Sequence, residues 1–290
     1  MSSVTGRISE IKQPYGGYLK PSEFRVTDLD DGITLNDTEN LSGSSIGSTV
    51  DYLARFLSGT PFQEAFKIPL TGLKYALKYN ARIVSEQEYK ALTTEITGLD
   101  DKSVIYACKL ASFDIWSRDQ SRAKQLAIGQ TSPDTATIQN IQTMTKRTLT
   151  FFEKYGPIVE HGFRFDPASE QITLEDGSIG YNLAPYYDMM AERKGSYGGY
   201  TPTVEAGEGD YLTKDTIWEL KVVKSRLTSQ VTLQLLMYWI MGLNSKQKNF
   251  MNIRYLGVFN PRLNKVYLYD LASISQETVR TVSKEVICYE

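Results

Sequence analysis

The sequence has little histidine and little cysteine: one histidine, His161, and two cysteines, Cys108 and Cys288. Zinc hydrolases with several His ligands, HNH-type nucleases and Ser-His-Asp or Cys-His hydrolases all need well-placed imidazoles, and this chain supplies one at most. Two cysteines are too few for a disulfide framework, a cysteine-rich metal site or an iron–sulfur cluster. His161 has two open interpretations, a residue near a functional cleft or, more commonly, an ordinary hydrogen-bonded side chain.

Long apolar runs are also absent. No run approaches the roughly 18 apolar residues of a spanning helix, and residues 1–7 lack the apolar stretch of a signal peptide. The chain has 290 residues, of which 41% are hydrophobic and 23% charged, enough for one large core or a core with an appended subdomain. We therefore expect no membrane association and a reducing cytoplasm as the compartment.

An excess of basic residues is missing as well, because the net charge is −2 and the pI is about 5.7. A protein that follows a nucleic-acid backbone usually shows such an excess, so any basic surface must be local. The candidate patches are Arg118, Arg122 and Lys124; Lys146 and Arg147; Lys224 and Arg226; and Lys246, Lys248 and Arg254. Each of these alone is more often a solvated face than a phosphate-binding track.

The most informative segment runs from Gly209 to Gly242 and contains an acid, then Glu-x-Lys, then Gln-x-x-x-Tyr. Carboxylates at Asp210 and Glu219 can share a divalent metal through hard oxygen ligands. A lysine at position 221 can steer or activate the attacking water. This order of residues predicts phosphodiester hydrolysis, with Asp210, Glu219 and Lys221 as the catalytic residues.

The segment 216–223 is rich in β-branched and aromatic residues and reads as a strand. Its period of two places Glu219 and Lys221 on one face and Trp218, Leu220 and Val222 on the other. An acid and a base on a buried face would be costly without a metal or a solvent-filled cleft to relieve them. An exposed face of an edge strand is the alternative for this segment taken alone.

A helix is predicted after this strand, with Thr228 or Ser229 as its N-cap and Gly242 as its C-terminal stop. Its apolar residues recur at helical spacing, and the set is Leu233, Leu236, Met237 and Ile240. Gln234 and Tyr238 lie one turn apart on a different stripe, which should face the cleft. An isolated Gln-x-x-x-Tyr pair often arises by chance, but this one follows Lys221 by thirteen residues.

These ordered motifs resemble the PD-(D/E)xK nuclease superfamily, and within it the RecB-like branch that includes lambda exonuclease and the nuclease domains of bacterial recombination helicases. The resemblance implies that Asp210 and Glu219 bind Mg²⁺ or Mn²⁺ and that Lys221 assists the water. It implies that Gln234 and Tyr238 order the substrate and the active site. The expected substrate is nucleic acid, with DNA favoured over RNA.

Two upstream segments resemble the same template more weakly. Residues 45–53 are similar to the first helix of the family, with Asp51 where the family has a histidine ligand. Asp51 is either a hard ligand for magnesium or a helix-surface residue. Glu160, in a strand-like segment over 157–165, is expected near the cleft rather than as a direct ligand, although an acid at this place in the chain order could also complete the site. Lys224 and Arg226 are the best candidates for phosphate contacts, because they connect the Glu-x-Lys strand to the following helix.

The predicted fold is α/β: a restriction-endonuclease-like mixed central sheet flanked by helices, with a helical subdomain before the sheet. The expected units are an N-terminal arm (1–43), a helical subdomain that includes the first motif helix (44–156) and a nuclease core (157–290). Helices are predicted over 50–57, 86–92, 104–111, 138–144 and 275–286, and strands over 158–165, 171–174, 204–211, 216–223, 253–259 and 265–270. Residues 181–200 are expected to form a loop, either over the cleft or on the plain surface.

Two classes of function remain open at this stage. The first is a magnesium-dependent nuclease. The second is a catalytically silent nuclease-fold module that binds nucleic acid or protein, because a fold alone does not fix a function. A degraded site would favour the second class, and Asp210, Glu219 and Lys221 show no degradation. The sequence does not distinguish exonuclease from endonuclease action or DNA from RNA as the substrate, and it does not settle the oligomeric state.

Overall fold

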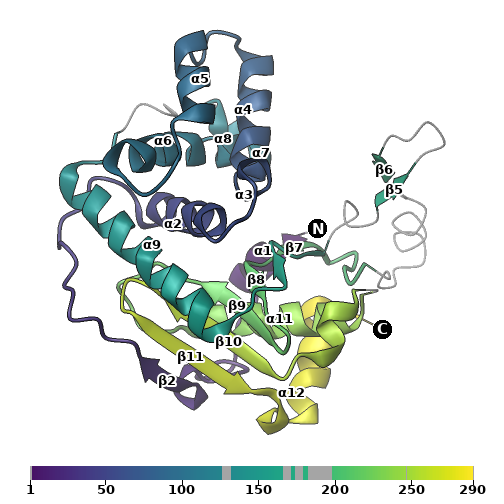
Figure 1. Ribbon diagram of the computed structural model, residues 1–290. Helices are drawn as coiled ribbons and strands as arrows, with labels where there is room; N and C mark the ends of the chain where they lie inside the picture. Colours follow the sequence, from purple (N-terminus) through teal and green to yellow (C-terminus); the bar gives the residue numbers. More distant parts are fainter. Residues whose placement is uncertain are drawn as a thin grey trace.

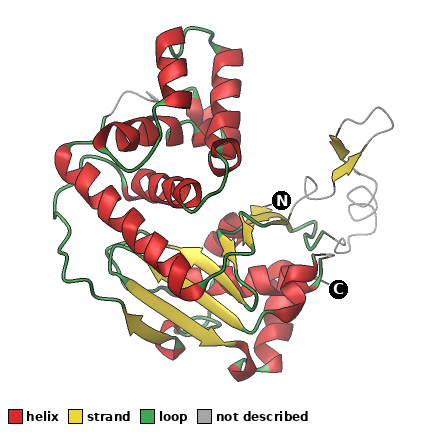
Figure 2. Ribbon diagram, viewed as in Figure 1, coloured by secondary structure: helices red, strands yellow, loops and turns green. Residues whose placement is uncertain are grey.

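The computed structural model describes residues 2–125, 132–165, 171–173, 179–181, 198–245 and 247–289. These residues form two lobes, one made of helices and one built around a sheet (Figure 1). Figure 2 shows the same division, with most of the strands gathered in the sheet lobe and the long helix α9 running down from the helical lobe across it. The chain termini both lie at the sheet lobe.

The helices are α1 (Val4–Glu10), α2 (Gly43–Leu57), α3 (Phe62–Ala65), α4 (Lys67–Tyr79), α5 (Glu86–Thr94), α6 (Asp101–Ala111), α7 (Asp114–Arg118), α8 (Gln120–Ala123), α9 (Thr135–Tyr155), α11 (Ser229–Leu243) and α12 (Gln276–Thr281), which continues into the π-helical turn η5 (Val282–Ile287). Short 3₁₀ turns are η1 (Pro21–Glu23), η3 (Lys248–Asn252) and η4 (Leu271–Ser273). The four internal helices predicted from the sequence are therefore confirmed as parts of α2, α5, α6 and α9.

The strands are β1 (Ser2–Ser3), β2 (Arg25–Asp28), β3 (Glu160–His161), β4 (Arg164–Phe165), β5 (Gln171–Thr173), β6 (Ile179–Tyr181), β7 (Val204–Glu208), β8 (Tyr211–Leu212), β9 (Thr216–Leu220), β10 (Tyr255–Asn260) and β11 (Lys265–Asp270). The main sheet has the order β2-β11-β10-β9-β8-β3. Strands β9 and β10 are parallel, as the crossover through α11 requires, and the other neighbours are antiparallel. The protein is thus an α/β protein with a mixed sheet, as predicted.

Helices cover both faces of this sheet. On one face, Phe151 of α9 stacks on Phe259 with ring centroids 4.3 Å apart and meets Trp218 edge-on at 4.8 Å. On the other face, α11 packs its apolar side chains against Ile217 and Val258. The core of the first face continues into the helical lobe through α2. Burial on both faces explains why every residue of β9 is buried, including Glu219.

Two predicted strands are each broken in two. The segment predicted as one strand over 158–165 forms β3 and β4, which belong to different sheets, because Gly162 adopts a φ of 72° between them. The segment predicted over 204–211 forms β7 and β8, again in different sheets, with Gly209 and Asp210 between them. A Cβ at Gly209 would lie 2.0 Å from the Phe163 ring, so only glycine fits this crossing.

The N-terminal segment is more ordered than the predicted arm. Val4 and Ile8 of α1 are buried in the core beside α11, and β2 pairs with β11 as the outer strand of the main sheet. In contrast, most of the predicted loop over 181–200 lies outside the described residues, as does Lys246. Among the helices that the structure describes, none combines the length and the apolar character needed to cross a bilayer.

Candidate active site

Asp210 occupies the turn between β7 and β8 that Gly209 makes possible. Its carboxylate Oδ2 accepts a hydrogen bond from the backbone N–H of Leu220 at 2.7 Å. Because Leu220 directly follows Glu219 in β9, this bond fixes the Asp210 carboxylate next to the Glu-x-Lys segment. A quarter of the Asp210 side chain remains exposed, so the site is open to solvent at this residue.

Glu219 is held on the α11 face of β9, with 6% of its side chain exposed. Its Oε1 accepts from Lys221 Nζ at 2.6 Å and from Gln234 Nε2 at 3.2 Å. Its other oxygen, Oε2, is buried and has no hydrogen-bond partner within the described part of the chain. A buried carboxylate oxygen without a partner is costly, so this atom calls for a cation or an ordered water.

Helix α11 places Gln234 and Tyr238 against this group. Gln234 Nε2 donates to the Tyr238 hydroxyl oxygen at 2.9 Å as well as to Glu219, and the Tyr238 hydroxyl donates to the backbone carbonyl of Glu208 at 2.5 Å. The chain of hydrogen bonds therefore joins β9 to the end of β7, just before Asp210. All five residues predicted from the motif order are brought together.

The orientation of α11 differs in one respect from the prediction. The apolar stripe is buried as expected, but Gln234 and Tyr238 are also buried, at 6% and 1% exposure, rather than facing an open cleft. The cause is that α11 lies between the sheet, α1 and η5, so that it has almost no solvent face. Gly242 is not a C-terminal stop either, since the helix runs to Leu243 and a Cβ at Gly242 would overlap the Phe250 ring.

The electrostatics of the site favour an added positive charge. Burial, followed by the neighbouring charges of Glu219 and Asp51, raises the pKa of Asp210 well above its usual value, although Lys221 and Arg55 oppose the rise. Burial alone would lower the pKa of Lys221, but Glu219 and Asp210 outweigh it and raise that pKa. Lys221 is therefore an ammonium at neutral pH.

Asp51 lies near the site but is already paired. It forms a bidentate contact with Arg55 one turn later on α2, with an Nη2–Oδ2 distance of 2.7 Å, and its Oδ1 accepts from the Tyr211 hydroxyl. Arg55 Nη2 also approaches Asp210 Oδ1 at 4.0 Å. The guanidinium thus stands between Asp51 and Asp210. Arg55 was not among the predicted residues, and its only sequence signal is the Asp-x-x-x-Arg spacing on this helix.

Glu160, Lys224 and Arg226 lie further out than the motif residues. The Glu160 carboxylate accepts from Asn249 Nδ2 at 2.8 Å. Lys224 Nζ donates to the backbone carbonyl of Asp37 at 3.1 Å. The exposed Arg226 lines a hollow of about 80 Å³ that Lys221 also lines. Of these three residues, Arg226 is therefore the one that shares a hollow with a motif residue.

His161 packs edge-on against the rings of Phe152 and Tyr211. Burial, followed by the charge of Arg55, lowers the pKa of His161 to about 4, although Asp51 acts in the opposite direction. The imidazole is therefore neutral near pH 7. Its Nδ1 is buried without a partner in the described structure. Of the two interpretations left open by the sequence, the structure favours the one that places His161 near the site, because its neighbour Tyr211 directly follows Asp210.

The residues present fit a hard divalent cation with few protein ligands. The described residues contain no cluster of three or more His, Cys, Asp or Glu side chains arranged to hold a metal. Mg²⁺, however, is usually bound through one or two carboxylates, with water and substrate phosphates supplying the remaining oxygens. Asp210 and the unpartnered Oε2 of Glu219 provide such a pair. Asp51 does not extend it, because Arg55 already neutralises that carboxylate.

A second polar network links the helical lobe to this site. The Tyr52 hydroxyl donates to Asp114 Oδ2 at 2.7 Å, and Arg118 bridges from Asp114 to Glu208, with Nη1 3.1 Å from Glu208 Oε2. Glu208 is the residue whose carbonyl holds Tyr238. The α7 helix is thus joined to the strand that ends at the candidate site. Sequence reasoning missed this network because its members come from three separate elements, α2, α7 and β7.

Asp114 gives this network a pH dependence. Burial raises the pKa of Asp114 to about 6, against the opposing effects of Tyr52 and Arg118. Because the folded pKa exceeds that of the unfolded chain, Asp114 opposes folding increasingly as pH rises from about 4 to about 6. We expect Asp114→Asn to raise the free energy of unfolding by roughly 1–2 kcal/mol at pH 8 and not at pH 4, since the amide oxygen still accepts from Tyr52. Urea unfolding of the wild type and the variant at both pH values measures this difference. An equal gain in the free energy of unfolding at both pH values would contradict the prediction. The control is Asp37→Asn, which changes an exposed aspartate.

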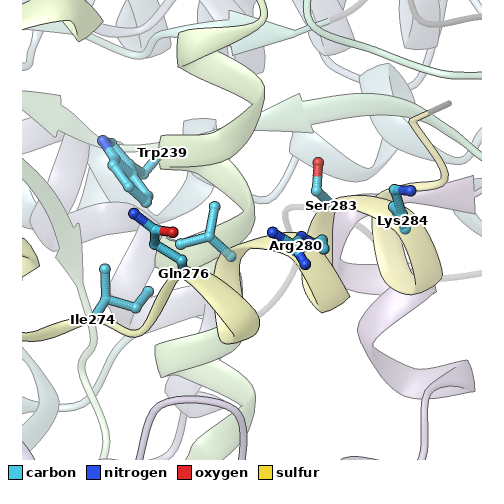
Figure 3. A pocket seen from close by; sticks show the side chains of 7 residues that line it. Trp239, Ile274, Gln276, Arg280, Ser283 and Lys284 are labelled. Carbon is cyan, nitrogen blue, oxygen red and sulfur yellow. The ribbon is translucent and has the colours of Figure 1, made fainter.

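A larger hollow lies elsewhere on the molecule. It has a volume of about 410 Å³ and is lined by Trp239, Ile274, Gln276, Val279, Arg280, Ser283 and Lys284. Figure 3 shows these side chains coming from α11 on one side and from α12, η5 and the loop before α12 on the other. None of them belongs to the candidate site, so the size of a hollow does not locate the chemistry in this protein.

Comparisons with known proteins add no assignment. The chain matches no protein-family model, no curated protein and no solved structure. The interpretation of the site therefore depends on its own geometry and on the motif order.

Proposed function

We propose that this protein is a metal-dependent nuclease of the PD-(D/E)xK type that hydrolyses phosphodiester bonds, with DNA as its substrate and a restriction-endonuclease-like core as its fold. The observation that supports the proposal most is the state of Glu219. One of its oxygens is held by Lys221 and Gln234, the other is buried without a partner in the described part of the chain, and the charge of Glu219 acts on Asp210. A divalent cation between these two carboxylates would satisfy that oxygen and stabilise the ionised form of Asp210.

Under this proposal Asp210 and Glu219 hold Mg²⁺ or Mn²⁺. The ion, when bound, would polarise the phosphodiester and lower the pKa of a water. Lys221 would bring a positive charge to the attacking water and to the phosphate, since its ammonium is fixed within 2.6 Å of Glu219 Oε1. Gln234 and Tyr238 would act as positioning residues, because their hydrogen bonds hold Glu219 in a single orientation relative to the end of β7.

The polarity around the site suits a phosphate-containing substrate. Lys221 retains 28% exposure of its side chain and borders the small hollow that Arg226 also lines. Two cations at one opening provide the charge that a phosphate requires, in a protein whose overall charge is negative. Arg226 is therefore proposed as a phosphate contact rather than as part of the chemistry.

A second candidate function, a nuclease-fold module without turnover, has one observation in its favour. The cations near the site are already paired, Lys221 with Glu219 and Arg55 with Asp51. A site whose carboxylates are already neutralised by ion pairs with neighbouring side chains can keep its structure without a metal. The unpartnered oxygen of Glu219 and the raised pKa of Asp210 speak against this reading, because ion pairs that complete the site would leave neither.

A digestion assay separates the two candidates. The purified protein is incubated with linear duplex, circular duplex and single-stranded DNA in Mg²⁺, in Mn²⁺ and in EDTA. We expect cleavage of at least one DNA form with either metal and none in EDTA. Cleavage that is equal in EDTA would contradict the metal proposal. Binding of DNA without cleavage of any form would favour the module.

A further inference from the structure

The helical lobe carries a concentration of positive charge that the overall composition conceals. Residues 65–85, which contain α4, include Lys67, Lys74, Lys78 and Arg82 but no aspartate or glutamate. The whole chain has a net charge of −2. A local stretch of this kind is the sort of basic surface that an acidic protein needs if it binds a polyanion.

The geometry of α4 gathers this charge on one side together with aromatic rings. Lys74 and Lys78 are one turn apart and both are exposed. Tyr75 and Tyr79 form the adjacent stripe, with 43% and 59% of their surfaces exposed. The helix therefore presents exposed lysines and exposed tyrosine rings side by side.

Lys124 extends this surface onto the neighbouring segment. Its Nζ lies 4.9 Å from the centre of the Tyr79 ring, and that ring packs against Trp116 of α7 at 5.2 Å. Helices α4 and α7 lie side by side in the lobe (Figure 1). We call Lys74, Lys78, Tyr79 and Lys124 together the α4 face. Within the described part of the chain, no carboxylate lies within 4.0 Å of any of these three ammonium groups.

The α4 face is connected to the candidate site through Arg118. This half-exposed residue ends α7, two residues before α8 continues toward Lys124, and its guanidinium is 3.1 Å from Glu208. Glu208 precedes Asp210 by two residues. Arg118 therefore contacts the strand that ends at the candidate site and lies six residues before Lys124 in the chain.

We propose that the α4 face binds a single-stranded segment of nucleic acid that extends from the cleavage site. The three lysines would contact successive phosphates, and the Tyr79 ring would stack on an unpaired base. Lysines with interleaved exposed aromatic rings match this ligand, because phosphates follow the strand and unpaired bases present flat faces, whereas paired bases do not. The inference rests on the proposed function, since it names the part of the protein that holds the substrate outside the site.

The test is a binding measurement that does not require cleavage. Fluorescence anisotropy of a labelled single-stranded 20-mer, and of its duplex, is measured in EDTA over a range of KCl concentrations. The variants are the triple substitution K74A/K78A/K124A, Tyr79→Ala and Tyr79→Phe. The matched control is K12A/K20A/K154A, which removes three exposed lysines outside the α4 face and makes the same change in net charge. Circular dichroism checks that each variant is folded.

We expect the triple variant to bind the single strand at least about tenfold more weakly. The negative slope of log affinity against log salt should become less steep by about 2, because three phosphate contacts are lost. The control should keep an affinity and a slope near those of the wild type. Tyr79→Ala should weaken single-strand binding by about tenfold and leave duplex binding unchanged, and Tyr79→Phe should restore it. Wild-type affinity and slope in the triple variant would overturn the proposal, as would equal loss in the control. Equal loss of duplex and single-strand binding in Tyr79→Ala would overturn the single-strand assignment.

Parallel digestion in Mg²⁺ separates this proposal from the proposed function. If the wild type cleaves DNA while the triple variant binds it normally, the α4 face is wrong and the nuclease stands. If the triple variant loses binding while the wild type never cleaves, the surface stands and the nuclease is wrong. If the wild type binds no nucleic acid at all, both are overturned.

Discussion

Replacing Lys221 with alanine should reduce DNA cleavage by about two or more orders of magnitude while leaving metal and DNA binding in place. The substitution removes the ammonium from beside Glu219 Oε1 but keeps both carboxylates and the Gln234 amide. Proton transfer and water positioning by a fixed side chain typically contribute about 10²–10⁴ in rate, so the loss should appear in kcat. Because the pKa of Lys221 is raised by its acidic neighbours, raising the pH to 9 should not remove its charge in the wild type.

The measurement is single-turnover cleavage with saturating enzyme in Mg²⁺, together with DNA affinity in Ca²⁺. Lys12→Ala serves as the control, since it removes an exposed lysine far along the sequence from every candidate residue and should cleave at the wild-type rate. A Lys221→Ala protein that is folded and cuts at the wild-type rate would remove the lysine from the mechanism. A variant that fails to bind DNA would instead show that Lys221 serves mainly to hold the substrate.

Replacing Asp210 with asparagine should separate stability from function. Burial and the charges of Glu219 and Asp51 raise the pKa of Asp210 in the folded protein. A carboxylate with a raised folded pKa opposes folding once pH passes its unfolded value, so its ionised form destabilises the metal-free protein at pH 7–8. The amide oxygen of asparagine can still accept from the Leu220 N–H. We therefore expect the metal-free variant to have an equal or higher Tm than the wild type.

The same variant should lose the response to metal. A cation whose free concentration is a hundred times its Kd stabilises the folded state by about 2.7 kcal/mol, and this stabilisation appears as a rise in Tm. The wild type should show this rise in Mn²⁺ or Mg²⁺, and both Asp210→Asn and Asp210→Ala should not, with cleavage reduced at least about a hundredfold. Asp30→Asn, at an exposed loop position, is the control. An unchanged metal-induced rise in Asp210→Asn would place the metal elsewhere.

The motif segment was predictable because its information is local. The alternation in β9 places Glu219 and Lys221 together, and helical spacing places Gln234 and Tyr238 one turn apart, so both patterns can be read within a few residues. The burial of Gln234 and Tyr238 on α11 was harder to predict. The apolar residues of α11 occur on nearly every side of the helix, which is the pattern of a helix enclosed by other elements and differs from a single apolar stripe.

The remaining parts of the site depend on contacts between distant segments. Arg55 approaches Asp210 from α2, and Arg118 reaches Glu208 from α7, over separations that no local pattern encodes. The divided strands have a different cause. Gly162 and Gly209 sit inside segments of strand-like composition, and the chain turns there because one has a positive φ and the other lies against Phe163. An isolated glycine within a strand pattern signals such a break.

The central claim is that Asp210 and Glu219 share one divalent cation. The most direct measurement is anomalous diffraction from crystals soaked in Mn²⁺, collected at the manganese absorption edge. We expect one peak with an oxygen of Asp210 and the Oε2 of Glu219 each within roughly 2.0–2.6 Å of it. A fully ordered site with no peak between these carboxylates at saturating Mn²⁺, or a peak held by other residues alone, would contradict it.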